Sequence, residues 1–254
     1  MSRRLSSLVI VVAGMLMAAG LAGAQEQHPH WSYKGATGPG HWAQLEKDYG
    51  PCARGHSQSP IDIHSKAAKT ADLPAIAFDY KPSPLKIIDN GHSIQIDYAP
   101  GSSITVGDKQ YGLVQFHFHR PSEEKIDGKR YDMVAHLVHR DAGGTFAVVA
   151  VLFSKGAPNA LITTLWENLP AEKEVEKVVD GVTVNAADLL PKSHAYYTFI
   201  GSLTTPPCTE GVRWFVLKQP TTVSGDEVAR FAKTYPMNAR PVQPLHGRSV
   251  EASK

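Results

Sequence analysis

Two histidines that stand two residues apart, His117 and His119, offer the clearest chemistry in this sequence. They lie in the run Gln115-Phe116-His117-Phe118-His119, in which polar and aromatic residues alternate. Alternate residues of a β-strand project from one face, so a strand here points both imidazoles the same way and packs both phenylalanines behind. Two imidazoles held in this way form half of a zinc site, although a plain polar sheet face would show the same pattern.

A catalytic zinc ion needs a third protein ligand and one open coordination position. The segment Met133–His139 predicts a nearby strand and offers two candidates, His136 and His139. Because these residues are three apart, their side chains point to opposite faces, and only one of them joins the pair. His136 shares its face with Val134 and Val138, which gives a metal an apolar neighbour, so we interpret His139 as structural.

The residues alone leave a second metal-binding interpretation open. The spacing His117-x-His119-x-x-x-Glu123 also resembles the metal motif of the cupins, in which two histidines, a glutamate and a later histidine hold iron, manganese or nickel. In that arrangement Glu123 is a ligand, and the chemistry is dioxygenation or isomerisation. The glycine spacing before His117 fits a cupin poorly.

The elements that must position these side chains are mainly strands. From residue 76 to residue 153 the apolar residues mostly follow a period of two. Asn90-Gly91, between two pairs of isoleucines, predicts a hairpin with a two-residue turn. Tyr111–Arg120 and Thr145–Phe153 predict further strands, and the nearly continuous apolar run of the second is typical of a buried central strand.

Helices are few in this pattern. Asn159–Asn168 predicts one, and a second begins at Ser224, whose hydroxyl and Glu227 form a capping box, and runs to about Thr234. Residues 28–60 are rich in glycine, proline, histidine and tryptophan, which predicts an irregular segment on the surface. The sequence therefore predicts a mainly β (α+β) fold, in which a large sheet carries short peripheral helices.

The composition is that of an ordinary globular chain with little net charge. The full sequence holds 26 lysines and arginines against 24 aspartates and glutamates, and Arg3 and Arg4 account for the excess. The lysines are scattered singly, which argues against a nucleic-acid-binding surface. No repeat, low-complexity tract or linker divides residues 25–254, so we expect one domain.

Residues 1–24 have the pattern of a cleaved signal peptide. Arg3 and Arg4 precede the apolar run Leu8–Leu21, and the small residues Ala22-Gly23-Ala24 form a cleavage site. The apolar run is shorter than the roughly 20 residues of a spanning helix, so a membrane anchor is the less favoured alternative. We expect an exported protein, periplasmic or secreted, with no membrane contact after cleavage.

The chain has two cysteines, Cys52 and Cys208. An even number in an exported chain favours one disulfide over two buried free thiols. Such a bridge ties the N-terminal region to the segment around Thr204.

Over almost the whole length after the signal segment, the sequence resembles the α-carbonic anhydrases. The matching motifs follow in order: His30-Trp31-Ser32-Tyr33, Gln58-Ser59-Pro60-Ile61-Asp62, Asn90-Gly91-His92, Gln115-Phe116-His117-Phe118-His119, Pro121-Ser122-Glu123, His136-Leu137-Val138-His139, Gly201-Ser202-Leu203-Thr204-Thr205-Pro206-Pro207-Cys208 and Asn238-Ala239-Arg240-Pro241-Val242-Gln243-Pro244-Leu245. The resemblance implies a central, mostly antiparallel twisted sheet of about ten strands.

It also implies one Zn²⁺ on His117, His119 and His136, and reversible hydration of carbon dioxide to bicarbonate and a proton. A Cys52–Cys208 disulfide and cis peptide bonds before Pro60 and Pro207 belong to the same resemblance.

Catalytic roles follow from the resemblance as well. In the family a zinc-bound hydroxide attacks carbon dioxide, and the residue matched by Thr204 accepts a hydrogen bond from it and donates to the residue matched by Glu123. The backbone N–H of Thr204 would hold the product bicarbonate, with Thr205 beside it. His92 matches the proton shuttle, and an unperturbed imidazole, with a pKa near 6.5, suits proton exchange with buffer.

Carbon dioxide has no charge, so its binding site should be a dry apolar wall. The family's pocket positions are occupied here by Val138, Val148, Leu203, Val212 and Trp214. The polar side of the family's pocket, which orders water, corresponds to Tyr33, Gln95 and Gln115. Gln115 can also accept a hydrogen bond from His117.

Two positions depart from the family pattern. Members usually carry Ser-Glu-His where this chain has Ser122-Glu123-Glu124, and a glutamate where this chain has Val134. That glutamate orients the third histidine, and losing such a partner typically weakens metal binding or activity by about 10–100-fold. We hypothesise that Glu124 reaches into the space that Val134 leaves and hydrogen-bonds His136; a bridging water and a weakened site are the alternatives.

Two classes of function follow. One is a carbonic anhydrase, a zinc lyase with weak esterase activity, which binds carbon dioxide and bicarbonate and is inhibited by sulfonamides and anions. The other is a carbonic-anhydrase-like zinc- or ligand-binding protein with weakened or lost catalysis, although such relatives usually lack one of the three histidines. A homodimer is compatible with either.

Overall fold

The structure is a computed structural model, and residues 30–254 are described here. The predicted signal peptide, residues 1–24, lies outside the described residues. Within residues 30–254, no helix combines the length and the apolar character that crossing a membrane requires.

Strands make up most of the described chain, and the helices are short. The strands are β1 (Asp62–Ile63), β2 (Lys69–Thr70), β3 (Ile76–Asp79), β4 (Ser83–Asp89), β5 (Ile94–Asp97), β6 (Ser103–Val106), β7 (Lys109–His119), β8 (Lys125–Ile126), β9 (Lys129–Arg130), β10 (Met133–Arg140), β11 (Phe146–Lys155), β12 (Lys177–Val184), β13 (Tyr196–Ser202), β14 (Glu210–Leu217), β15 (Thr221–Val223) and β16 (Glu251–Ala252). The α-helices are α1 (Trp42–Leu45), α2 (Pro51–Arg54), α3 (Ala160–Glu167) and α4 (Gly225–Thr234), and the 3-10 turns are η1 (Gly35–Thr37), η2 (Lys47–Tyr49) and η3 (Ala186–Leu189).

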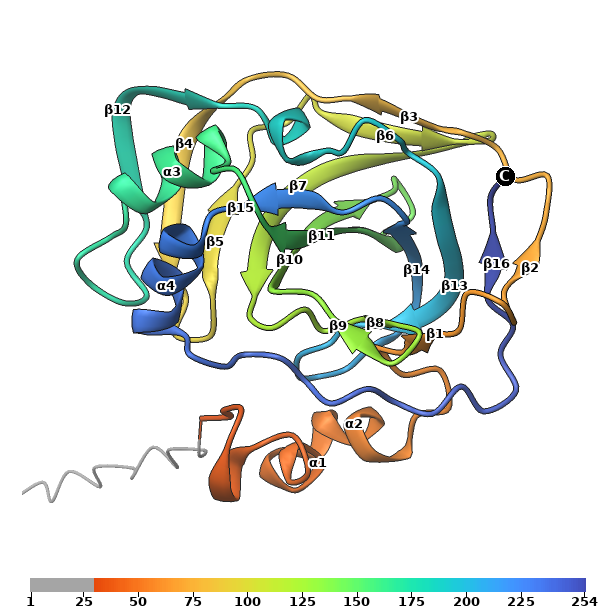
Figure 1. Ribbon diagram of the computed structural model, residues 1–254. Coiled ribbons are helices and arrows are strands. Elements are labelled where there is room, and N and C mark those ends of the chain that lie inside the picture. Colours follow the sequence, from red (N-terminus) through yellow and green to blue (C-terminus); the bar gives the residue numbers. More distant parts are fainter. Residues whose placement is uncertain (1–29) are drawn as a thin grey trace, which may run out of the picture.

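One twisted 13-stranded sheet forms the body of the protein, with the helices at its periphery (Figure 1). Its main path is β12-β4-β5-β7-β10-β11-β14-β13-β16-β2, and β3, β6 and β15 pair beside it. Neighbouring strands are antiparallel except in the pairs β11–β14, β11–β15 and β16–β2. A second, small sheet has the order β1-β8-β9. The predicted fold class, a mostly antiparallel sheet with short peripheral helices, is confirmed.

The strands that carry the histidines start and end within two residues of their predicted bounds. β7 and β10 pair in antiparallel register, with His136 opposite His117 and Val134 opposite His119. β11 lies on the other side of β10, and its residues Ala147–Phe153 are all buried, as the apolar run predicts. A slip of one residue would turn every side chain of β10 to the wrong face, so burial on both faces fixes this register.

The hairpin of β4 and β5 is present, but its turn differs from the prediction. The connection is Asn90–Ser93, four residues instead of two. The side-chain carbonyl of Asn90 accepts hydrogen bonds from the N–H groups of His92 and Ser93, at 3.0 and 2.8 Å. The asparagine therefore closes a wider loop, with Gly91 at φ 82°.

Both predicted helices are confirmed. Asn159 caps α3, and Ser224 with Glu227 forms the capping box of α4. The N-terminal segment is more regular than expected, because it contains η1, α1, η2 and α2.

Two apolar clusters cover the two faces of the sheet. One contains Phe116 and Phe118, behind the histidines of β7. The other contains Val134, Val138 and Trp214, on the face that carries the histidines. The site thus lies where a polar group of side chains meets an apolar cluster.

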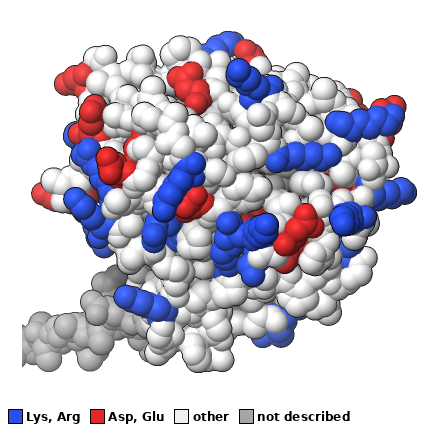
Figure 2. Space-filling view, in the orientation of Figure 1, with Lys and Arg blue, Asp and Glu red and all other residues white. Residues whose placement is uncertain are grey.

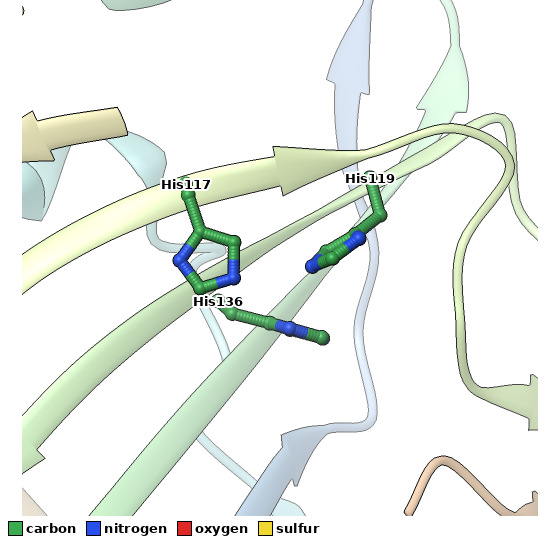
Figure 3. Close-up of side chains that lie close together, drawn as sticks. All are labelled: His117, His119 and His136. Atoms are coloured by element: carbon green, nitrogen blue, oxygen red, sulfur yellow. The ribbon is translucent and has the colours of Figure 1, made fainter. Parts of the chain in front are cut away.

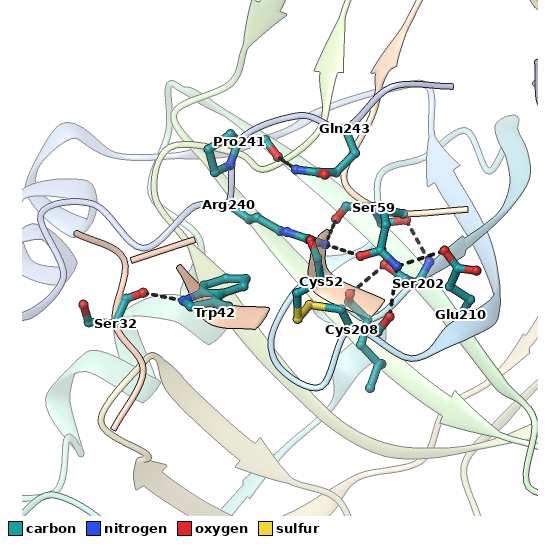
Figure 4. Close-up of a disulfide and its surroundings, with 12 residues drawn as sticks. Ser32, Trp42, Cys52, Ser59, Ser202, Cys208, Glu210, Arg240, Pro241 and Gln243 are labelled. Carbon is teal, nitrogen blue, oxygen red and sulfur yellow. Dashed lines mark hydrogen bonds between the residues drawn. A yellow bond between two sulfur atoms is a disulfide. The ribbon is translucent and has the colours of Figure 1, made fainter. Parts of the chain in front are cut away.

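The loop between β13 and β14, which carries Thr204, is fixed from two directions. The predicted Cys52–Cys208 disulfide is confirmed, and it joins this loop to α2 (Figure 4). Ser59 and Ser202 exchange hydrogen bonds between backbone N–H and side-chain hydroxyl, at 2.9 and 3.1 Å. Gly201 allows this approach, since a Cβ there would lie 2.1 Å from the Ser59 hydroxyl. The peptide bonds before Pro60 and Pro207 are cis, as the resemblance implies, and so is the one before Pro121.

Candidate metal centre

Three imidazoles converge on one face of the sheet. His117 and His119 project from β7, and His136 reaches the same place from β10 (Figure 3). One nitrogen from each ring lies within 4.8 Å of the others. Among residues 30–254 this is the only group of three or more such side chains with a geometry that could hold a metal ion.

The second nitrogen of each ring is held by a hydrogen-bond acceptor. Nδ1 of His117 donates to the side-chain oxygen of Gln115 at 2.9 Å, and Nδ1 of His119 donates to the backbone oxygen of Asn238 at 2.7 Å. Nε2 of His136 donates to Oε1 of Glu124 at 2.9 Å. A neutral imidazole has one N–H and one lone pair, so these contacts direct the lone pairs of His117 Nε2, His119 Nε2 and His136 Nδ1 toward the shared space.

This donor set fits a zinc ion. Three imidazole nitrogens without a thiolate are a known catalytic zinc arrangement, and zinc ligands of this kind commonly pass their other N–H to a carboxylate or carbonyl. Nε2 of His119 is buried and has no hydrogen-bond partner among the described residues, and a metal ion at this point would be its partner.

The contact between Glu124 and His136 expected from the sequence is present. Val134 is fully buried in the apolar cluster beside it.

Burial keeps two of the three rings neutral. It lowers the pKa of His117 to about 3 and that of His119 well below the usual value, and the neighbouring His136 adds to both effects. Burial also lowers the pKa of His136, but the carboxylates of Glu124 and Glu123 outweigh it and raise the pKa overall. Neutral imidazoles are the form that binds metal.

Glu123 is a fully buried carboxylate at the edge of this group. Its Oε1 accepts a hydrogen bond from the backbone N–H of Arg240 at 2.7 Å. Its Oε2 lies 3.6 Å from His119 Nε2 and 3.8 Å from His136 Nδ1, beyond hydrogen-bond distance. Burial raises the pKa of Glu123 to about 7, and the side chain of Thr204 acts in the opposite direction. The hydrogen bond from Thr204 to Glu123 stays a prediction, because Oε2 of Glu123 has no hydrogen-bond partner of regular geometry among the described residues.

The C-terminal segment Asn238–Arg240 holds the site together, which pattern analysis did not reveal. Besides accepting from His119, Asn238 donates its side-chain amide to the backbone oxygens of His92 and Phe118, both at 3.0 Å. The buried guanidinium of Arg240 donates to the backbone oxygens of Ser59 and Cys52 at 2.7 and 2.9 Å (Figure 4). Each of these contacts joins residues more than a hundred positions apart, so no local sequence pattern predicts them.

An apolar pocket of about 220 Å³ opens beside His117 and His136. Its other lining residues are Gln115, Val138, Phe146, Val148, Leu203, Thr204, Thr205 and Trp214. Four of the five predicted wall residues are therefore in place. Val212 does not line the pocket; its side chain is buried in the apolar cluster behind it, 1% exposed, and Phe146 is a wall residue that the sequence analysis missed.

A smaller polar cavity of about 110 Å³ lies on the other side of the histidines. The three residues predicted for the polar side, Tyr33, Gln95 and Gln115, all line it, together with Trp31, Asn90, His92, Ser93, His117, His119 and Thr205. Gln95 accepts from the Asn90 amide at 3.1 Å and donates to Asp97 at 2.7 Å. The Tyr33 hydroxyl is buried and finds no hydrogen-bond partner in the part of the chain that the structure describes, and burial raises its pKa well above the usual value.

His92 forms part of the wall of this polar cavity. Its ring stacks on Trp31, with 3.5 Å between ring centroids, and on His30 at 4.6 Å. Burial, followed by the neighbouring His30 and Lys173, lowers the pKa of His92 to about 4. Its Nε2 is buried and has no hydrogen-bond partner within residues 30–254. The stacking on Trp31 was not foreseen from the sequence.

His139 lies apart from the site, as expected for a strand residue three positions after His136, which points to the opposite face. It hydrogen-bonds the hydroxyl of Tyr80 at 2.8 Å on the opposite face, and burial lowers its pKa to about 3.

Comparison with known proteins places this architecture in a family. Residues 37–254 match the family model of the eukaryotic-type carbonic anhydrases. A carbonic anhydrase of Nostoc sp. is 38% identical over 89% of this chain and 87% of its own, and one of Klebsiella pneumoniae is 44% identical over 87% and 90%. The α-carbonic anhydrase of Thermovibrio ammonificans, solved with the inhibitor sulfanilamide, superimposes with a TM-score of 0.85 at 39% identity, covering 89% of this chain and 99% of that one.

Two buried histidines allow a matched test of the metal centre. We expect His119→Ala to abolish stoichiometric metal binding, because three ligands become two, and His139→Ala to retain it. The measurement is the zinc content of each purified, dialysed protein by elemental analysis. Equal zinc contents in the two variants would contradict the assignment of ligands, and thermal unfolding of both shows whether either lost its fold.

Proposed function

The chain belongs to the eukaryotic-type carbonic anhydrase family, and we propose that it hydrates carbon dioxide reversibly, to bicarbonate and a proton, at a zinc ion on His117, His119 and His136. The observation that carries the proposal is the convergence of three imidazole nitrogens whose partner nitrogens are all held by acceptors. When bound, zinc supplies the Lewis acidity that lowers the pKa of water to about 7, as is established for carbonic anhydrases.

Glu123 and Thr204 are proposed to orient the attacking oxygen. In this role the Thr204 hydroxyl accepts a hydrogen bond from that oxygen and donates its own proton to Glu123. Burial raises the pKa of Glu123, but a cation on the three histidines would favour its ionised form. An ionised carboxylate only accepts, so Glu123 then fixes the direction of the chain, and the Arg240 N–H at 2.7 Å fixes the carboxylate. The backbone N–H of Thr204 and the neighbouring Thr205 are the proposed contacts of bicarbonate.

The apolar pocket is the proposed site for carbon dioxide. Val138, Val148, Leu203 and Trp214 line it beside His136. An uncharged, weakly polar molecule gains from such a wall, while a charged product does not, so the same surface favours release of bicarbonate. Sulfonamides are expected to bind here, because a relative with the same fold was solved with sulfanilamide. We also propose an exported location, with which the disulfide agrees.

The decisive experiment is stopped-flow carbon dioxide hydration on protein of measured zinc content. We expect the zinc-loaded protein to accelerate hydration, and Thr204→Ala to lower kcat/KM on the order of 100-fold, the scale of losing orientation of reacting atoms. Thr222→Ala, at an exposed strand position, is the control and should behave as the parent. Full zinc occupancy without acceleration in the parent would support the alternative, a carbonic-anhydrase-like binding protein without catalysis.

His92 is proposed to carry protons between the site and solvent. It lines the polar cavity beside His117 and His119 and also an outer pocket that contains His30 and Lys173, so it lies between the two. A ring with a pKa of about 4 accepts protons poorly near neutral pH. We therefore infer that His92 works after its ring leaves the stack on Trp31, where greater solvation brings its pKa back toward 6.5.

His92→Ala tests the shuttle. In weak buffer we expect kcat to fall by about tenfold or more while kcat/KM is unchanged, because proton transfer follows the hydration step. Added imidazole should restore turnover. His64→Ala removes an exposed histidine elsewhere and is the control. An unchanged kcat in dilute buffer would refute this role.

Glu124 is proposed to hold the ring of His136 in place of a residue at position 134. On β7, Gln115 supports His117 from two residues before it, so position 134 is the equivalent place on β10. Val134 occupies that place and is fully buried, and Glu124 supplies the acceptor from the loop after β7. Glu124 thus acts through a ligand and is a positioning residue.

Removing the Glu124 carboxylate should weaken metal binding. We expect Glu124→Ala to weaken zinc affinity by about 10–100-fold, measured by competition with a chelator. Val134→Glu alone should also be harmful, because it buries a further carboxylate, whereas the double variant should regain affinity. Glu172→Ala, at an exposed position, is the control. A double variant no better than Glu124→Ala would show that the two positions are not equivalent supports.

A further inference from the structure

A polar cleft of about 350 Å³ lies behind the loop that joins β7 to β8. Its lining residues are Arg120, Pro121, Arg130, Tyr131, Asp132 and Val228. The lining comes from three places in the chain: the loop just after β7, strand β9 with the turn before β10, and helix α4. None of these residues belongs to the pocket or the cavity beside the three histidines.

Two guanidinium groups in this cleft have no acidic partner among residues 30–254. Arg120 donates from Nη1 to the backbone oxygen of Pro236, and Arg130 donates from Nη1 to that of Ser122. Each guanidinium has five N–H donors, so most of them remain unused. Nε of Arg120 is buried and has no hydrogen-bond partner in the described chain.

The one acidic residue in the lining is paired with a lysine. Asp132 accepts from the backbone N–H of Lys155 at 2.9 Å, and its other oxygen lies 3.7 Å from the ammonium group of the same lysine. The cleft therefore presents an excess of positive charge with free donors, which is the environment that binds an oxyanion. On the face shown in Figure 2, positive and negative side chains are largely interspersed.

The wall of the cleft is fixed before any ligand arrives. Ser122 and Tyr131 are joined by two hydrogen bonds, from Ser122 N–H to the Tyr131 oxygen at 3.0 Å and from Tyr131 N–H to the Ser122 hydroxyl at 2.9 Å. The N–H of Arg120 donates to the Asn238 side chain at 2.7 Å. Preorganised donors lower the entropic cost of binding a small ligand.

We propose that this cleft is a binding site for a small oxyanion of the bicarbonate or phosphate type, held by the guanidinium groups of Arg120 and Arg130. A planar guanidinium matches two oxygens of such an anion, and two guanidinium groups distinguish it from a spherical halide. The loop that forms one wall carries Glu123 and Glu124 and follows His119 directly, so the anion would bind next to the segment that supports the metal centre. The site itself does not rest on the proposed hydration activity.

Amide NMR of the isotope-labelled, zinc-loaded full chain tests the proposal. A saturating sulfonamide first blocks the histidine site, and sodium phosphate, sodium bicarbonate and sodium chloride are then titrated separately at constant ionic strength. We expect saturable shifts of the Ser122, Tyr131 and Asp132 amides with phosphate, bicarbonate or both, and none with chloride. Whichever oxyanion binds identifies the preferred geometry, tetrahedral or planar.

Arg130→Gln should weaken that binding by about tenfold or more, the scale of a lost charge-assisted hydrogen bond. Arg120→Lys should weaken it less, because the charge remains. The control is Arg213→Gln, which removes an arginine on β14 that also has no ion pair in residues 30–254 and lines a different cavity. Amide shifts that never saturate, or that chloride reproduces, would overturn the proposal. So would equal oxyanion affinities of the Arg130→Gln and Arg213→Gln variants. Failure of the sulfonamide to bind would count against the zinc site alone, since the cleft has its own amide signals.

Discussion

The antiparallel pairing of β7 with β10 is the constraint on which the metal centre depends. It sets His136 opposite His117, and because His119 is two residues further along β7, all three imidazoles share one face. Directly paired residues have Cβ atoms about 5 Å apart, which suits side chains that meet at one ion. The pairing is itself held by β11, which pairs with β10 along one edge and with β14 along the other, and whose central residues are all buried. All three candidate ligands therefore come from the sheet, whereas two of the three supporting acceptors lie outside its strands.

Those acceptors connect the site to the rest of the chain. One comes from β7 itself, one from the loop after it, and one from the C-terminal segment at Asn238. Two residues on, the buried Arg240 reaches the N-terminal helices through the Cys52 oxygen and lies over the Trp42 ring at 5.5 Å. A buried polar group that loses its partner costs about 1–3 kcal/mol, and more if it is charged. A substitution that removes one of these contacts should thus disturb the orientation of the histidines and also lower the stability of the fold.

How much the sequence could predict depends on whether the signal was local. The period of two along β7 and β10 placed His117, His119 and His136 on one face and His139 on the other, and the capping box at Ser224 marked the start of α4. The turn at Asn90 was predicted too short, because an asparagine side chain can close a longer loop as well as a tight one. Val212 was expected on the pocket wall, yet the sequence does not tell wall from core when both are apolar. Asn238 lay in a matched motif, but its contacts cross 119 positions and have no periodic signature.

The exchange between positions 124 and 134 shows why a missing motif residue is weak evidence for a missing interaction. An imidazole ligand needs one acceptor on its far nitrogen, and geometry allows that acceptor to arrive along the strand, as Gln115 does, or from a neighbouring loop, as Glu124 does. A glutamate at position 134 in addition to Glu124 would place two carboxylates on one N–H. The carboxylate at position 134, buried in the apolar cluster of Val138 and Trp214, would then have no donor. An unpaired buried charge costs several kcal/mol, so a glutamate in one place favours an apolar residue in the other. Positions 124 and 134 therefore have to be interpreted together, as one unit that is contiguous in space and separated in sequence.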